Sequence, residues 1–214
     1  VSMAIDSQTT AKLLNDLKSE NPEIRRKAVE FLGRFKAVEA VPQLIATLLN
    51  GNNSDEQESI VQALAAIEDK RATQSVVLTM LNTTSETLQV TCANALGLLK
   101  DTSAIPFLFD LLTKPEYQQN VPARLEAVTA IFRIGDRSAA PELLKLLPGQ
   151  PPVVQARLMK ILASFKYGPA LETITQYVDR TDVIQEGETE VKLGDVAFQA
   201  LQILNPMYAN QIQR

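Results

Sequence analysis

A block of about thirty residues recurs along this chain, and its apolar positions keep the same order each time. One apolar column comprises Leu32, Leu64, Leu96, Ile131 and Leu162, and the next lies three residues on, at Phe35, Ile67, Leu99, Ile134 and Phe165. Successive blocks are 32, 32, 35 and 31 residues apart. Such a period predicts stacked structural repeats, each of which buries its apolar face against its neighbours. We therefore expect one continuous domain over residues 1–214 that works as a surface.

Each block is expected to form a pair of helices. The first helix of the first block has one apolar face, made of Ile24, Ala28, Val29, Leu32 and Phe35, and the second has another, made of Val41, Leu44, Ile45, Leu48 and Leu49. Three prolines, Pro42, Pro106 and Pro141, recur in the first turn of the second helix, where a missing N–H costs little. These prolines fix the phase of the repeat.

The starts of the first helices also carry signals. Asn21 is expected to cap the helix that begins at Pro22, and Ser54 with Gln57 has capping-box spacing. The predicted organisation is a flexible start at 1–8, an N-terminal capping helix at 9–20, five helix pairs at 21–178, an acidic insertion at 179–190 and a C-terminal cap at 191–214. The capping helix corresponds to the second helix of a pair whose first helix is absent. The last helix is expected to stop before Asn205-Pro206.

Composition restricts the partners. The formal net charge is -4, and both signs are spread along the chain, which argues against nucleic acid as a partner because phosphate binding needs a concentrated basic surface. No apolar run is long enough to span a bilayer, so a membrane partner is not expected either. The single cysteine, Cys92, suits a reducing compartment and is expected to be a small core residue rather than a reactive thiol. We expect a cytoplasmic protein.

The chain contains no histidine. Nucleophilic arrangements that use histidine as the base, and the common His and Cys zinc sites, therefore cannot be built from it. Its glycines are scattered singly, so the glycine-rich loops that cradle phosphates are absent as well. We accordingly expect no catalytic residue, no metal and no obligatory cofactor.

The sequence Asn-Pro-Glu-Ile-Arg-Arg-Lys-Ala at 21–28, and Leu-Gly pairs at Leu32-Gly33 and Leu96-Gly97, resemble the HEAT repeat, and more narrowly the bacterial HEAT-like type of phycobilisome lyases. The resemblance implies an all-α fold: a right-handed α-solenoid of about five helix pairs with an extra helix at each end. It also implies a polar ladder between repeats. The ladder would join the column Arg25, Gln57, Gln89, Arg124 and Gln155 to the turn residues Asp69, Asp101 and Asp136.

In HEAT-like arrays the second helices line the concave face, so a partner is expected on their solvent side. Apolar residues on this face, with charged residues at its rim, predict a protein-binding patch made of Leu78, Phe107, Asp110, Leu111, Glu142, Lys145, Leu146 and Tyr177. The alternative is that the apolar members of this set widen the core contact of each second helix. In that case their substitution would lower stability rather than binding.

Two functions follow. The first is a non-catalytic protein-interaction scaffold. The second, which rests on the resemblance, is a HEAT-like subunit of a bilin lyase, or a phycobilisome maturation or degradation factor, whose partner would be a phycobiliprotein or a second HEAT-repeat subunit. Under that alternative a bilin tetrapyrrole would be bound, with Lys145, Arg157, Tyr167 and Tyr177 as candidate contacts. Head-to-tail association of the basic N-terminal region with the acidic insertion stays open beside both.

Overall fold

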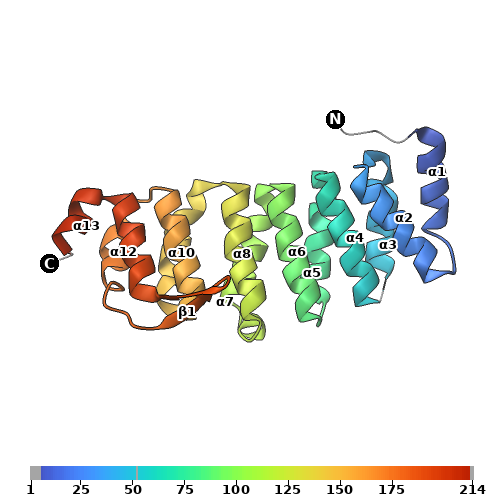
Figure 1. Cartoon of the computed structure of the whole chain (residues 1–214). Helices are drawn as coiled ribbons and strands as arrows, with labels where there is room; N and C mark the ends of the chain where they lie inside the picture. Colours follow the sequence, from blue (N-terminus) through green and yellow to red (C-terminus); the bar gives the residue numbers. More distant parts are fainter. Residues whose placement is uncertain (1–5, 52, 213–214) are drawn as a thin grey trace. The chain divides into compact units, whose positions relative to one another are not determined.

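The computed structural model describes residues 6–51 and 53–212. Most of these residues lie in α-helices, and the helices form antiparallel pairs, which confirms the predicted all-α class (Figure 1). The chain divides into two compact units, Val1–Asp110 and Leu111–Arg214, with the boundary inside the seventh helix. Each unit is described by itself, and the expectation of one continuous domain stays a prediction.

The first unit starts with a lone helix and continues with helix pairs. A short 3₁₀ turn separates the two helices of each pair, at η1 (Val38–Ala40), η2 (Lys70–Ala72) and η3 (Thr102–Ala104). First helices pack on first helices, α2 on α4 and α4 on α6, while α3 packs beside α5 (Figure 1). The helices are α1 (Ser7–Asp16), α2 (Pro22–Arg34), α3 (Val41–Asn50), α4 (Ser54–Ile67), α5 (Thr73–Asn82), α6 (Glu86–Leu99) and α7 (Ile105–Thr113), of which α7 crosses the boundary.

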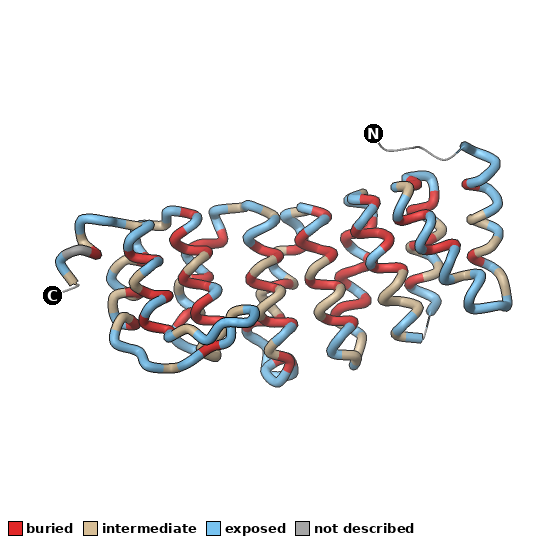
Figure 2. The backbone as a smooth tube through the Cα atoms, in the orientation of Figure 1, coloured by how far each residue is buried: buried red, intermediate tan, exposed pale blue. Residues whose placement is uncertain are grey.

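The second unit repeats this pattern. In it α8 packs on α10 and α10 on α12. Its helices are α8 (Val121–Ile134), α9 (Ala140–Leu146), α10 (Pro152–Ser164), α11 (Ala170–Thr175), α12 (Leu193–Leu204) and α13 (Pro206–Ile212), with 3₁₀ turns η4 (Pro115–Tyr117), η5 (Arg137–Ala139) and η6 (Leu147–Gly149). In both units the buried residues form stripes on the helix faces that meet other helices (Figure 2). The column from Leu32 to Leu162 is fully buried, as predicted.

Helix ends follow the repeat closely. Asn21 Oδ1 accepts from the Glu23 N–H at 2.9 Å, so the predicted cap is confirmed. In the second block the prediction is wrong by one residue, because Asn53 rather than Ser54 is the cap and accepts from the Glu56 N–H at 2.9 Å. Asparagine in an extended conformation serves this role as well as serine does.

Each first helix ends with a residue at positive φ. These residues are Lys36, Glu68, Lys100, Gly135 and Lys166, with φ values of 52°, 63°, 52°, 82° and 53°. Around the last of them, the Tyr167 N–H donates to the Leu162 carbonyl and the Lys166 N–H donates to the Ala163 carbonyl, the two bonds of a Schellman ending. Glycine, the residue that this conformation favours, is present in one block of the five.

The region predicted as an acidic insertion contains a β-hairpin. Strands β1 (Val183–Glu186) and β2 (Thr189–Lys192) pair antiparallel, and Gly187 at φ 63° begins the two-residue loop between them. The prediction of one extra C-terminal helix is also incomplete. Pro206 does end α12, but it begins α13, because proline suits the first turn of a helix.

Candidate functional site

The predicted second-helix patch is exposed only in part. In the first unit Leu78 is 39% exposed, and Phe107 and Asp110 are half-buried. In the second unit Glu142 and Lys145 are exposed and Leu146 is half-buried. Because the patch crosses the boundary between the units, its two portions are separate candidates for binding.

Leu111 and Tyr177 do not belong to the surface. Leu111 is fully buried and Tyr177 is 7% exposed, so for these two residues the alternative of a core contact holds, and they are not part of the predicted patch. Leu111 follows the buried Leu108 by three residues and precedes the buried Leu112, which places it on the core stripe of α7. Tyr177 lies three residues after the buried Ile174. Burial raises the pKa of the Tyr177 phenol, and the Arg180 guanidinium lies 5.9 Å from the centre of its ring.

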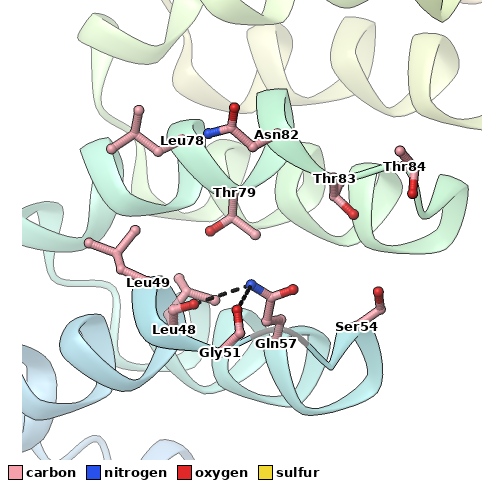
Figure 3. Close-up of a pocket in the computed structure, with 10 residues that line it drawn as sticks. All are labelled: Leu48, Leu49, Gly51, Ser54, Gln57, Leu78, Thr79, Asn82, Thr83 and Thr84. Atoms are coloured by element: carbon pink, nitrogen blue, oxygen red, sulfur yellow. Dashed lines mark hydrogen bonds between the residues drawn. The ribbon is translucent and has the colours of Figure 1, made fainter.

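A groove in the first unit contains the exposed member of the patch. It lies between the C-terminal parts of α3 and α5, and its volume is about 360 Å³ (Figure 3). Leu49 and Leu78, 50% and 39% exposed, supply its apolar portion. Asn82 supplies a polar group next to Leu78, and Thr84 supplies one toward the other end (Figure 3). Sequence reasoning assigned Leu49 to the core and missed it here, although the helix-end position of Leu49 was visible in the sequence.

The side chain of Gln57 caps the backbone at one end of this groove. Its Nε2 donates to the carbonyls of Leu48 and Gly51, at 3.2 Å and 3.1 Å (Figure 3). Both carbonyls belong to the end of α3, where the helix itself supplies no donor. These two hydrogen bonds fix the backbone at the end of α3, which lines the groove.

The same arrangement recurs in the column that was expected to form a polar ladder. Each side chain of this column donates to a backbone carbonyl just before its own helix, in Arg25, Gln57, Gln89, Arg124 and Gln155. The turn aspartates instead accept from the N–H two residues on, in Asp69, Asp101 and Asp136. In these bonds both sets of side chains cap backbone groups close to them in sequence, because those are the nearest unsatisfied groups, and Arg25 in addition reaches Glu56 of the next repeat.

Arg124 is the one charged member of this column in the second unit's described residues. It is 6% exposed, and its guanidinium donates to the Gln118 carbonyl at 3.2 Å and to the Gln150 side chain. Gln150 in turn donates to the carbonyl of Leu112 at 3.1 Å. Burial lowers the pKa of Arg124. Arg124 and Gln150 thus donate to backbone carbonyls of the segment before α8 rather than to a partner.

Cys92 has the position that the sequence predicted for it. Cys92 is fully buried, and burial raises the pKa of its thiol, so it is a core residue as predicted. Within residues 6–51 and 53–212, no three acidic or cysteine side chains are grouped so as to hold a metal ion. Of the candidate bilin contacts, Tyr177 is buried and Lys145 pairs with Glu142 at 3.0 Å.

No helix in the described part of the chain has the length and apolar character needed to cross a membrane. The cytoplasmic location stays a prediction. The basic and acidic regions considered for head-to-tail association have local partners: Arg25 pairs with Glu56 at 2.7 Å, and Lys160 contacts Glu186.

Comparison with known proteins identifies the repeat. No curated protein matches the sequence. A solved structure, the complex of CpcE and CpcF of phycocyanin lyase from Nostoc sp. PCC7120, is similar over 99% of this chain and 96% of that chain, with 15% identity and a TM-score of 0.49. This TM-score is too low for the likeness to support an inference about the chain. The model of the family described as HEAT repeats matches residues 4–65, 41–121 and 73–163, which together cover more than half of the chain. The chain therefore belongs to the HEAT-repeat family.

Proposed function

We propose that the chain is a non-catalytic scaffold that binds a protein partner through its second helices. The observation that carries this proposal is the groove between α3 and α5, where Leu49 and Leu78 are 50% and 39% exposed on neighbouring helices. Adjacent exposed leucines beside polar groups are typical of a partner surface rather than of a solvated face.

The groove suits an apolar side chain of a partner that also brings polar backbone. A volume of about 360 Å³ accommodates a leucine or phenylalanine side chain with part of its backbone. The amide of Asn82 offers both donors and an acceptor, and the hydroxyl of Thr84 offers one of each. A partner that inserts an apolar side chain between the leucines thus finds hydrogen-bonding groups beside it.

The second unit supplies a separate and more polar candidate surface. On α9, Glu142 and Lys145 are exposed, with side-chain exposures of 50% and 72%, and their ion pair is worth little in water. Leu146 beside them is half-buried. We assign this surface a secondary role, because charged groups at the edge of an interface contribute more to specificity than to affinity.

The absence of histidine and the buried thiol of Cys92 support a binding role over nucleophilic catalysis. Phycobiliproteins and a second HEAT-repeat subunit remain the specific partners that the repeat type suggests. A bilin would be tested directly, by mixing the protein with phycocyanobilin and recording the visible absorption band.

The experiment is affinity capture with three forms of the chain, followed by quantitative mass spectrometry. Leu78→Asp is the test variant, and Leu98→Asp on α6 is its matched control, because both leucines are 39% exposed. Proteins retained by the wild type and by Leu98→Asp but lost from Leu78→Asp are partners of the groove. Retention that is equal in all three forms, with unchanged thermal stability, would refute the proposed surface.

A further inference from the structure

The chain contains one Asn-Gly pair, and the fold places it at the exposed end of a helix beside the second-helix groove. Asn50 is the last residue of α3 and is exposed. Gly51 follows it in an extended conformation, with φ −76° and ψ 147°, and lines the groove between α3 and α5. A chemical change in this pair therefore alters the lining of the groove.

An asparagine can react with its own main chain, which is one reason why asparagine is a thermolabile residue. The main-chain nitrogen of the following residue attacks the side-chain carbon Cγ. The bond from Cγ to Nδ2 breaks, and Nδ2 leaves as ammonia with the proton of the attacking N–H. Water then opens the resulting succinimide ring at either of its two carbonyls. One product is aspartate, and the other is isoaspartate, in which the main chain runs through Cβ and Cγ.

Two features of Gly51 favour this attack. Gly51 has no Cβ, so its nitrogen can approach the preceding side chain without steric hindrance. Its N–H also takes part in no hydrogen bond that the described residues supply. The nitrogen is thus free to react, although it lies at the end of a helix, where an N–H commonly donates to a carbonyl of the last turn.

The next block supplies an internal comparison. Asn82 has the place of Asn50, is the last residue of α5 and is also exposed. Thr83 follows it, has a branched Cβ and donates its N–H to the Thr79 carbonyl at 3.0 Å. Attack by this nitrogen meets steric hindrance and breaks a hydrogen bond. The two asparagines share position and exposure, so the residue that follows each of them is the main difference.

One contact of Asn50 opposes the reaction. Its Nδ2 donates to the Ala46 carbonyl at 2.9 Å, which holds the amide toward the preceding turn of α3. The bond is exposed, and a bond of this kind slows the reaction by about tenfold or less, because its net stabilisation is small. The contact therefore delays the attack without preventing it.

We propose that Asn50 is a site of spontaneous deamidation and that its isoaspartate product alters the second-helix groove. Gln57 Nε2 donates to the carbonyls of Leu48 and Gly51 at 3.2 Å and 3.1 Å, so its two hydrogen bonds span the residue that changes. Isoaspartate adds one atom to the main chain between these carbonyls. The Gln57 amide then loses the geometry of one bond or the other, and the end of α3 is no longer fixed.

The first test follows the intact chain at mildly alkaline pH, where base assists loss of the N–H proton. Tryptic peptides are analysed by tandem mass spectrometry, and Asn50 is expected to convert while Asn82 stays unchanged. Gly51→Ala is expected to slow the conversion severalfold. Its melting temperature checks the fold, since the new Cβ would meet the Thr47 carbonyl oxygen at 3.2 Å, a contact that a small shift relieves.

Thr83→Gly separates the missing Cβ from the free N–H. The variant gives Asn82 a following glycine whose N–H still donates to the Thr79 carbonyl, so Asn82 is expected to convert more slowly than Asn50. Absence of conversion at Asn50 would overturn the proposal. Equal conversion of the two asparagines, in the wild type or in Thr83→Gly, would overturn it as well.

The second test compares the purified isoaspartate form with Asn50→Asp, which carries the same added carboxylate on a main chain of normal length. Amide hydrogen exchange at the end of α3 is expected to be faster in the isoaspartate form, and equal exchange would overturn the effect on the groove. Loss of groove partners from the isoaspartate form alone is expected too, and this last expectation rests on the proposed function. If Leu78→Asp loses no partner, the proposed function fails, whereas mass spectrometry and hydrogen exchange still decide the inference.

Discussion

Replacing Lys166 by glycine is expected to stabilise the protein. Lys166 ends α10 at φ 53°, in the left-handed region, and its N–H donates to the Ala163 carbonyl at 2.9 Å. That hydrogen bond uses backbone atoms only, so the substitution keeps it. The Lys166 side chain is exposed, and no interaction of it is among those that the structure shows, which makes it a cleaner site than Lys36, whose ammonium lies 2.6 Å from Glu68.

The magnitude follows from two opposing effects. A residue with a Cβ in the left-handed region costs about 1–2 kcal/mol relative to glycine. Glycine increases the conformational freedom of the unfolded chain, which lowers stability by about 0.4–1 kcal/mol. The free energy of unfolding is therefore expected to rise by about 0.5–1 kcal/mol, and the melting temperature by ~2 °C for a chain of this size.

Urea unfolding followed by circular dichroism measures the change in the unfolding midpoint. Lys192→Gly is the control, since Lys192 is exposed at φ −83° and has no left-handed strain to relieve. It is expected to lower the midpoint, because glycine gives the unfolded chain more freedom and removes a side chain from the end of β2. A Lys166→Gly midpoint that falls as far as that of Lys192→Gly would refute the argument from backbone strain.

Three further predictions concern packing and titration. Gly194→Ala is expected to lower the free energy of unfolding by about 1–3 kcal/mol, because its Cβ would lie 2.4 Å from the Val178 carbonyl oxygen, and an unchanged urea midpoint would contradict this close approach. The hydrogen bond from the Ser103 N–H holds the pKa of Asp101 below its ordinary value of 3.8, so the stability that the ionised carboxylate contributes is complete above about pH 4 and is lost as the pH falls through the lowered native pKa. Asp101→Asn is therefore expected to reduce the acid sensitivity of the melting temperature, and an unaltered pH profile would contradict this. Leu111→Asp is expected to lower the free energy of unfolding by about 3 kcal/mol or more, whereas Leu78→Asp changes it by about 0.5 kcal/mol or less; similar losses in the two variants would contradict their assignment to core and surface.

The interior of the fold could be predicted from the sequence because the same apolar pattern recurs in every block. Leu64 and Leu96 are buried in register, and Pro106 lies in the first turn of α7 as the phase required. Each apolar column has the same neighbours in every block, so one correct assignment determines the others. The hairpin at Val183–Lys192 lies outside the repeat, so no other block could indicate it.

The candidate site was predicted less well because its residues lie at the ends of helices and at the end of the array. Tyr177 was assigned to the surface by column, but α11 ends at Thr175, and beyond the helix the register no longer determines which way a side chain points. Leu49 was assigned to the core by its place in an apolar run, yet it lies one residue before the end of α3 and is 50% exposed. Helix ends are where periodicity loses its predictive value.

Ile24 shows why the end of an array requires separate treatment. Three of its four column partners, Leu88, Ala123 and Val154, are fully buried, whereas Ile24 is 41% exposed; the fourth is Glu56, which pairs with Arg25. The register is the same, so the difference arises from the neighbouring helices: α6, which carries Leu88, packs on α4, and α10, which carries Val154, packs on α8, whereas α2 has no preceding first helix among the described residues. An apolar side chain that keeps the repeat pattern at such a position has no core to stabilise, and Phe31 beside it is larger than its alanine counterparts in three later blocks. Burial in a repeat protein is thus a property of a pair of helices, because the same apolar register is buried where a first helix precedes it and exposed at Ile24, where none is described.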